Sequence, residues 1–154
     1  MTNKVKAGAI RAAILNPLAG WKHEFLPMPE WDGVTVAVRE PLLEDRAFWL
    51  EPLRASAGVE SDDDQDTARA KYARVSAEDY KASYARLFVR VLFVETLEGW
   101  RREFEDDDAK EVAEAYGAAH DRIVSKAIAL GDLNIDPDEA GKKPSAETPT
   151  SDLN

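Results

Sequence analysis

The two histidines and the carboxylate runs are the side chains of this sequence that could carry chemistry. His23 and His120 are too few, and too far apart in the sequence, to form a metal motif of known spacing. His120 falls in the first turn of an expected helix, where it could act as a base. The chain, however, has no cysteine and no serine in a GxSxG context to serve as its nucleophile. We therefore interpret His120 as a partly buried packing residue.

One acidic segment has the beginning of a calcium site. Asp132, Asn134 and Asp136 match the first three ligands of an EF-hand loop, but Pro137 replaces the required glycine and Lys143 the bidentate glutamate. The runs SDDDQD and EDDD have no loop geometry of their own, so we interpret them as a solvated face and as partners of a helix dipole. With no phosphate-binding glycine motif either, we expect no metal, no other cofactor and no enzymatic activity.

The composition is that of one globular domain in a chain of 154 residues, with 44% hydrophobic and 32% charged residues. No run approaches the ~20 apolar residues of a membrane span, and Arg11 interrupts the apolar residues near the amino terminus, so we expect no export signal. The lack of cysteine fits a reducing cytoplasm. A formal charge of −10 disfavours binding to nucleic acid.

A β-hairpin is predicted over residues 21–39. Asp32 and Gly33 favour a two-residue type I′ turn, in which both residues have positive φ. After this turn, alternate valines point to one face, as in a half-buried strand. Before it, a partner strand is expected over residues 21–26 and is closed by the prolines at 27 and 29.

Helices are predicted over residues 41–55, where Pro52 limits the helix, and over 77–95, the most buried one. The segment VRVLFV inside the second helix also has the composition of a strand. Between the two helices, residues 57–67 are expected to form a mobile acidic loop.

Two further helices are expected over residues 106–116, ended by Gly117 in the left-handed conformation, and over 118–130, ended by Gly131. Residues 1–20 form an arm with a weakly amphipathic helix, and residues 132–154 are too poor in apolar residues to fold. The predicted fold class is α+β. A small antiparallel hairpin packs on four or five helices in a single domain over residues 21–131, followed by a disordered acidic tail.

Four tryptophans are the candidates for protein contacts. Trp31 is expected at the hairpin tip, where an exposed ring often marks a binding surface. Trp21, Trp49 and Trp100 are more readily explained by core packing. The candidate partner-binding residues are Trp31, Trp49 and Trp100.

The order of these parts resembles the tail assembly chaperones of long-tailed, siphovirus-type phages and prophages of actinobacteria. The similarity covers residues 21–55 and 84–131, from PEWDG-VTVAVREP and LLEDRAFW to YGAAHDRIVSKAIAL. The acidic loop and the amino-terminal helix depart from the pattern. The matching residues are Pro29, Glu30, Trp31, Gly33, the alternating valines, Arg39, Glu40, Tyr116, Gly117, Asp121 and Arg122.

The resemblance implies a non-enzymatic protein that binds the tape-measure protein and helps to recruit the major tail protein during tail polymerisation. It would act in the host cytoplasm, be absent from the mature virion and be able to form homo-oligomers. An apolar groove together with strong negative charge would suit such a partner, because a tape measure exposes apolar helical faces until tail subunits surround it.

Two other classes remain open. A virion structural or connector protein has the same acidic, cysteine-free composition. An acidic mimic of DNA is less favoured, because the carboxylates concentrate in a loop, in helix starts and in the tail rather than along one rigid surface.

The resemblance also implies a longer, frameshifted form of the protein. Gly141 and Lys142 could be encoded by a slippery run of G followed by A, inside a segment that we expect to be disordered. The alternative is a plain pair of solvated lysines, Lys142 and Lys143.

Overall fold

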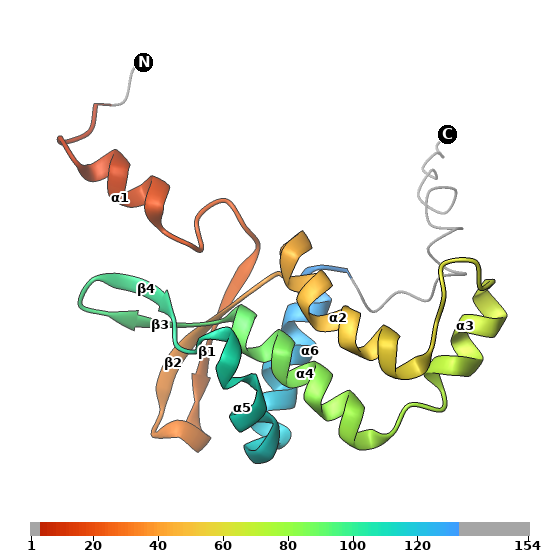
Figure 1. Cartoon of the computed structure of the whole chain (residues 1–154). Coiled ribbons are helices and arrows are strands. Elements are labelled where there is room, and N and C mark those ends of the chain that lie inside the picture. The colour runs from red at the N-terminus through yellow and green to blue at the C-terminus, as the bar shows by residue number, and fades with distance from the viewer. Residues whose placement is uncertain (1–3, 133–154) are drawn as a thin grey trace, which may run out of the picture.

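The computed structural model describes residues 4–132 and has an α+β fold, as predicted (Figure 1). Its sheet is antiparallel, with the strand order β1-β2-β3-β4. The strands are β1 (His23–Met28), β2 (Val34–Arg39), β3 (Leu92–Thr96) and β4 (Gly99–Arg102). The α-helices are α1 (Ala9–Leu15), α2 (Leu43–Ala57), α3 (Gln65–Tyr72), α4 (Ala77–Val91), α5 (Ala109–Ala115) and α6 (Ala118–Leu130), and the 3-10 helices are η1 (Pro29–Trp31) and η2 (Asp106–Asp108).

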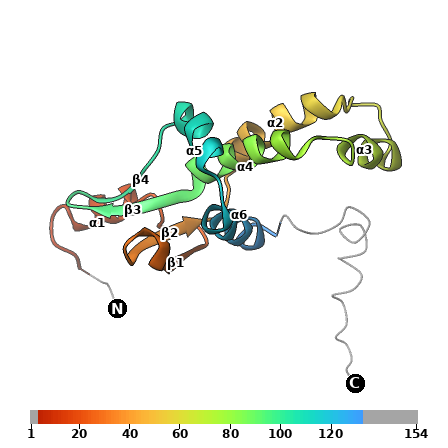
Figure 2. The ribbon, with the colours of Figure 1, turned by 90° about the horizontal axis from the view of Figure 1, so that it is seen from below.

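The molecule is elongated. Figure 2 shows the sheet and α1 at one end and α3 at the other, with α2 and α4 running between them. Helix α4 packs against α2, α5 and α6, and α6 also covers β1 and β2. The main core lies between these helices and one face of the sheet, which we call the inner face.

The first hairpin has a longer turn than predicted. Asp32 and Gly33 do have positive φ, at 58° and 74°. The prediction of a two-residue type I′ turn was wrong. The 3-10 helix η1 precedes these two residues, and the Gly33 N–H closes the longer turn by donating to the Met28 carbonyl at 3.0 Å. Strand β1 also runs through Pro27 to Met28 rather than ending before Pro27. Pro27 is tolerated because β1 is an edge strand of the sheet.

Strand β2 is buried on both faces along its second half, whereas a half-buried strand was expected. Val36 and Val38 face the helices in the main core. Ala37 faces the other, outer side of the sheet, where it packs with Leu18 and Phe93. The second cluster explains the difference, because Leu18 lies in a segment that the sequence pattern assigned to the arm.

A second hairpin replaces the end of the expected helix over residues 77–95. Helix α4 ends at Val91, and β3 begins at Leu92. The alternative reading of VRVLFV as a strand therefore holds for its second half. Phe93 pairs with Ala37 of β2 and with Arg102 of β4, so the sheet extends beyond the single hairpin that was predicted.

Helix α2 continues through Pro52 to Ala57, and the prediction that proline limits it was wrong. Proline has no N–H to donate to the carbonyl four residues earlier and distorts the turn around it. The Phe48 carbonyl, which lacks this donor, and the neighbouring Trp49 carbonyl both accept hydrogen bonds from α4. The Phe48 carbonyl accepts from Arg86 Nε at 2.6 Å, and the Trp49 carbonyl from Ser83 Oγ at 3.1 Å. Tertiary contacts thus compensate for the proline.

Replacing Ser83 by alanine is expected to cost about 1 kcal/mol of unfolding free energy, because a buried hydrogen bond between α4 and α2 is lost. The measurement is urea unfolding followed by circular dichroism. Ser125, which is exposed on α6, gives the matched control, and its replacement by alanine should leave stability within about 0.5 kcal/mol. Equal effects of the two substitutions would contradict this role of Ser83.

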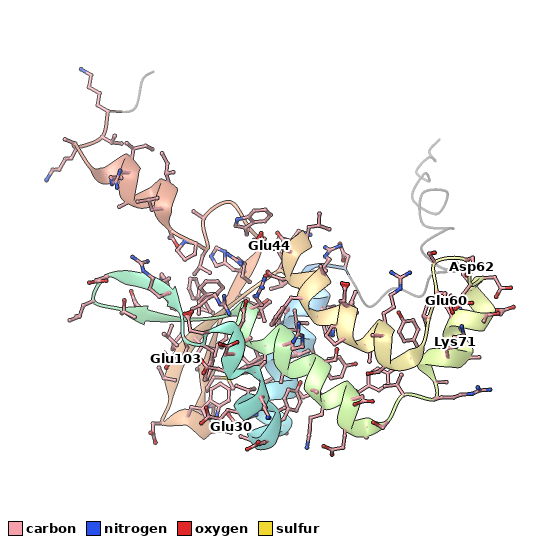
Figure 3. The ribbon with its side chains drawn as sticks, viewed as in Figure 1. Glu30, Glu44, Glu60, Asp62, Lys71 and Glu103 are labelled. Atoms are coloured by element: carbon pink, nitrogen blue, oxygen red, sulfur yellow. The ribbon has the colours of Figure 1, made fainter. Side chains whose placement is uncertain are left out.

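The acidic segment is more ordered than the predicted loop over residues 57–67. Asp64 caps α3 by accepting from the Thr67 N–H at 2.7 Å. Lys71 reaches back from α3 to the Asp63 carboxylate at 2.7 Å and to the Gly58 carbonyl at 3.0 Å. Figure 3 shows Lys71 at this end of the molecule, together with Glu60 and Asp62. The run of carboxylates therefore belongs to a helix start organised around one lysine.

A chain of ion pairs ties the sheet to the helices. Asp45 in the first turn of α2 lies 3.6 Å from Arg39 of β2 and 3.0 Å from Arg90 of α4. Arg90 also binds Asp106 at 2.8 Å, and Asp106 binds Arg102 of β4 at 2.9 Å. The hydrogen bond from Arg90 lowers the pKa of Asp106 below its ordinary value. We call these five residues the charge network.

Helix α6 spans Ala118–Leu130, as predicted. Gly117 does not end the preceding helix in the left-handed conformation. Its φ is −150°, and it serves as the amino-terminal cap of α6. The predicted disordered tail lies outside the described residues, except for Asp132. Within residues 4–132, no helix combines the length and the apolar character needed to cross a bilayer.

Candidate partner-binding surfaces

An apolar groove of about 280 Å³ opens on the inner face of the sheet, beside Trp31. Strands β2 and β3 form its floor, and η1, α4, α6 and the segment after β4 form its walls. The lining residues are Trp31, Val34, Val36, Phe88, Leu92, Val94, Glu103, Phe104 and His120. We call this site the groove.

Trp31 is a wall of the groove and not a free hairpin tip. Its ring is half-buried and packs edge-on against Phe88, with 6.2 Å between the ring centroids. The His120 ring lies 5.5 Å from Trp31, 5.0 Å from Phe88 and 5.3 Å from Tyr116, on which it stacks. These contacts agree with the interpretation of His120 as a packing residue.

His120 also caps its own helix. The Gly117 N–H donates to Nδ1 of His120 at 3.0 Å, which requires that nitrogen to be unprotonated. Burial lowers the pKa of His120 below its ordinary value of 6.5. The neutral ring therefore belongs to the folded state at neutral pH.

Stability is expected to fall in mild acid because of His120. A histidine whose pKa is depressed by folding contributes stability above its unfolded pKa of about 6.5, and this contribution is lost as the pH falls through the folded pKa. Replacing His120 by glutamine keeps an acceptor for the Gly117 N–H and removes the titration. Urea unfolding at pH 7.5 and pH 5.0 should show a smaller loss in the variant. An unchanged loss would assign the acid sensitivity to other groups.

Carboxylates lie at one end of the groove and in a hollow next to it. A second hollow of about 390 Å³ shares Glu103, Phe104 and His120 with it and adds Asp108 and Glu111. Within residues 4–132, no Lys, Arg or His nitrogen lies within 4.0 Å of the carboxylates of Glu103, Asp108 and Glu111. We call these three residues the acidic rim. Such a rim favours a ligand that carries positive charge next to apolar side chains.

The outer face of the sheet carries an aromatic pair, Phe25 of β1 and Trp100 of β4. Their ring centroids are 5.2 Å apart, and Phe25 is 50% exposed. Trp100 is half-buried and packs on the cluster of Leu18, Ala37 and Phe93. We call this pair the aromatic patch. Exposed aromatic rings on a firm base are typical of protein-binding hot spots.

The three tryptophans chosen from the sequence thus lie in three places. Trp31 lines the groove on the inner face, and Trp100 belongs to the aromatic patch on the outer face. Trp49 is only 7% exposed and packs in the main core, so no contact with a partner is proposed for it below. Sequence reasoning missed Phe25. The sequence shows that His23 and Phe25 lie on one face of this strand and Glu24 and Leu26 on the other, but it does not determine which face is exposed.

Comparison with known proteins agrees with the resemblance seen in the sequence. A family model described as phage tail assembly chaperone matches residues 9–143. The structure of the bacteriophage HK97 tail assembly chaperone matches with 26% sequence identity and a TM-score of 0.54, over 80% of this chain and 97% of that one. No curated protein matches the chain. This chain therefore belongs to the phage tail assembly chaperones, a family of assembly proteins that are not enzymes.

Proposed function

We propose that this chaperone binds the tape-measure protein through the aromatic patch and helps to recruit major tail protein subunits to it. The observation that carries the proposal is the pairing of Phe25, which is 50% exposed, with the half-buried Trp100 on the outer face of the sheet. Flat aromatic rings can cover an apolar helical face while losing little side-chain entropy, as contact with a long helical partner requires. The net charge of −10 would keep a crowded complex soluble by mutual repulsion.

Co-expression with the cognate tape-measure protein tests the proposal. The tape measure is expected to be insoluble alone and soluble with the wild-type chain. Solubility should fall when Phe25 and Trp100 are both replaced by alanine. A tape measure that stays insoluble with the wild-type chain, or that is rescued equally by the double variant, would contradict the proposal.

The second candidate is a virion structural or connector protein, which the acidic composition also permits. Our proposal places the protein in the host cytoplasm during assembly and not in the finished particle. Mass spectrometry of purified virions separates the two, because a structural protein would be present in stoichiometric amounts and a chaperone would be missing.

We also propose a longer, frameshifted form, as the sequence pattern Gly141-Lys142 suggests. The expected coding sequence has a GGG-AAA run across these two codons and an overlapping open frame. A coding sequence without a homopolymeric run at this place would remove this proposal and leave the tape-measure proposal standing.

A further inference from the structure

Helix α2 exposes an apolar surface on the side that does not pack against α4. Leu43 is 83% exposed and Leu50 39%, and two residues seven apart lie on one face of a helix. With their neighbours they line a hollow of about 280 Å³ on the surface of α2. We call the apolar and basic residues of this hollow the α2 stripe, and they are Leu43, Arg46, Ala47, Leu50 and Arg54.

The two arginines of the α2 stripe have no carboxylate partner in the described part of the chain. No carboxylate oxygen of residues 4–132 lies within 4.0 Å of Arg46 or Arg54. Arg46 Nε is buried and has no hydrogen-bond partner among these residues. One carboxylate, that of Glu51, also lines the hollow. Two unpaired cations beside exposed leucines favour an occupant that is both acidic and apolar.

The segment that directly follows the described residues has this composition. Residues 133–140, which read LNIDPDEA, contain Leu133, Ile135 and three carboxylates, and no cation. Residues 4–15, in contrast, carry three basic residues and no acidic one, so charge excludes them from the α2 stripe. The family match extends through residue 143, so this acidic segment belongs to the part of the chain that matches the family.

The described chain ends near the start of α2. The carboxylate of Asp132 lies 3.8 Å from Lys22 Nζ. The Lys22 N–H donates to Glu40 Oε2 at 2.8 Å, and the Lys22 carbonyl accepts from the Glu40 N–H at 2.9 Å. Glu40 in turn precedes Leu43, the first residue of α2, by three positions. Lys22 therefore connects the point where residue 133 begins to the end of α2 that carries Leu43.

The segment is long enough to reach the α2 stripe and to follow it. From Leu43 to Arg54 the helix rises by about 16 Å. Residues 133–143 can span about 36 Å when they are extended. Pro137 favours such a backbone, because a proline disfavours the helical conformation of the residue before it, here Asp136.

We propose that residues 133–143 dock on the α2 stripe of the same chain. Leu133 and Ile135 cover apolar side chains at the start of the stripe, and the carboxylates that follow face Arg46 and Arg54. Because the segment is tethered, its effective concentration at the stripe is of the order of millimolar, so a contact that would be weak between separate molecules is populated. The docked segment closes the α2 stripe to other partners. This inference does not depend on how the tape measure binds.

A spin label beside the α2 stripe tests the proposal by NMR on the full chain, because the chain has no cysteine of its own. The label is attached at Glu51→Cys and, as a control, at Leu97→Cys. Leu97 is exposed on the turn between β3 and β4, away from α2 (Figure 1). The label at position 51 is expected to broaden the amide signals of residues 133–143, and the label at position 97 should leave them sharp.

Variants of the labelled chain identify the contacts. The charge variant combines Arg46→Glu with Arg54→Glu and should restore most of the intensity of the segment. Broadening should return when the same chain also carries lysines in place of the three carboxylates of the segment. The apolar variant, Leu43→Ser with Leu50→Ser, should also restore intensity without a change of charge. Thermal melting of every variant verifies that the fold is intact.

A mixed sample distinguishes docking on the same chain from docking on a second copy. An isotope-labelled chain without the spin label is mixed with an unlabelled chain that carries the spin label at Glu51→Cys. The segment should keep its signals in this mixture. Broadening in the mixture, equal broadening by the two label positions, or broadening that persists in both the charge and the apolar variants would each overturn the proposal.

Discussion

Replacing Asp45 by alanine is expected to lower the free energy of unfolding by about 3–5 kcal/mol, which corresponds to a fall in melting temperature of roughly 10 °C or more. Asp45 is 2% exposed and is shared by two guanidinium groups, those of Arg39 and Arg90. The Asp45 carboxylate also caps α2, because its Oδ2 accepts a hydrogen bond from the Leu42 N–H at 2.9 Å. The variant leaves Arg39, which is 8% exposed, without its carboxylate.

Glu44 supplies the matched control for Asp45. It is the neighbouring carboxylate in the first turn of α2, but it is exposed and outside the charge network. Replacing Glu44 by alanine removes its interaction with the helix dipole, about 0.3–1 kcal/mol, and its attraction to Arg39, which makes no salt bridge with it. Thermal and urea unfolding of both variants make the comparison. Similar losses at the two positions would show that the charge network contributes little to stability.

Signals carried by neighbouring residues allowed the sequence to predict several boundaries. The Ser76 Oγ accepts from the Asp79 N–H at 3.1 Å, and α4 begins directly after Ser76, at the predicted start of residue 77. The end of α6 before Gly131 was found in the same way. In each case the hydrogen bond that ends or begins the helix joins two residues within one helical turn, so a short stretch of sequence contains both the donor and the acceptor.

The failures have a common physical cause, which is a partner far away in the sequence. Pro52 is compatible with a continuous helix only because Ser83 and Arg86 take up carbonyls of that turn. The strand at Leu92 forms because β2 and β4 are available to pair with it. The failure at Gly117 is the exception, because its partner is local: α6 begins at once, and His120, three residues later, accepts the Gly117 N–H.

For the binding surfaces, the sequence predicted which types of residue take part but not where in the fold they lie. Aromatic rings at Trp31 and Trp100 were chosen for their capacity to bind partners, and both lie at least partly on the surface. Their assignment to opposite faces of the sheet depends on the strand register, which the sequence did not determine. The acidic rim was visible as a carboxylate-rich stretch, but its position beside an apolar groove follows from the packing of η2 and α5 on α4.

Trp100, which is half-buried on the outer face, and Trp49, which is buried in the core, should respond to substitution in opposite ways, a prediction that rests on the proposed function. Replacing Trp100 by alanine is expected to weaken tape-measure binding by at least about 30-fold, equivalent to about 2 kcal/mol, because the aromatic patch loses its larger ring. Replacing Trp49 by alanine should cost about 3–5 kcal/mol of stability, because a buried ring leaves a cavity in the core. Its effect on binding should be small at temperatures where the variant is folded.

A tape-measure segment fused to a soluble carrier allows both quantities to be measured. Calorimetric titration gives the dissociation constant of each variant, and thermal unfolding gives its stability. Trp100 packs against the outer-face cluster, so some loss of stability accompanies its replacement, but this loss should be smaller than that for Trp49. Unchanged affinity in the Trp100 variant would remove the aromatic patch as the binding site. A loss of affinity for folded Trp49→Ala as large as that for Trp100→Ala would instead place binding near α2, because a ring buried in the core can act only through the surface above it.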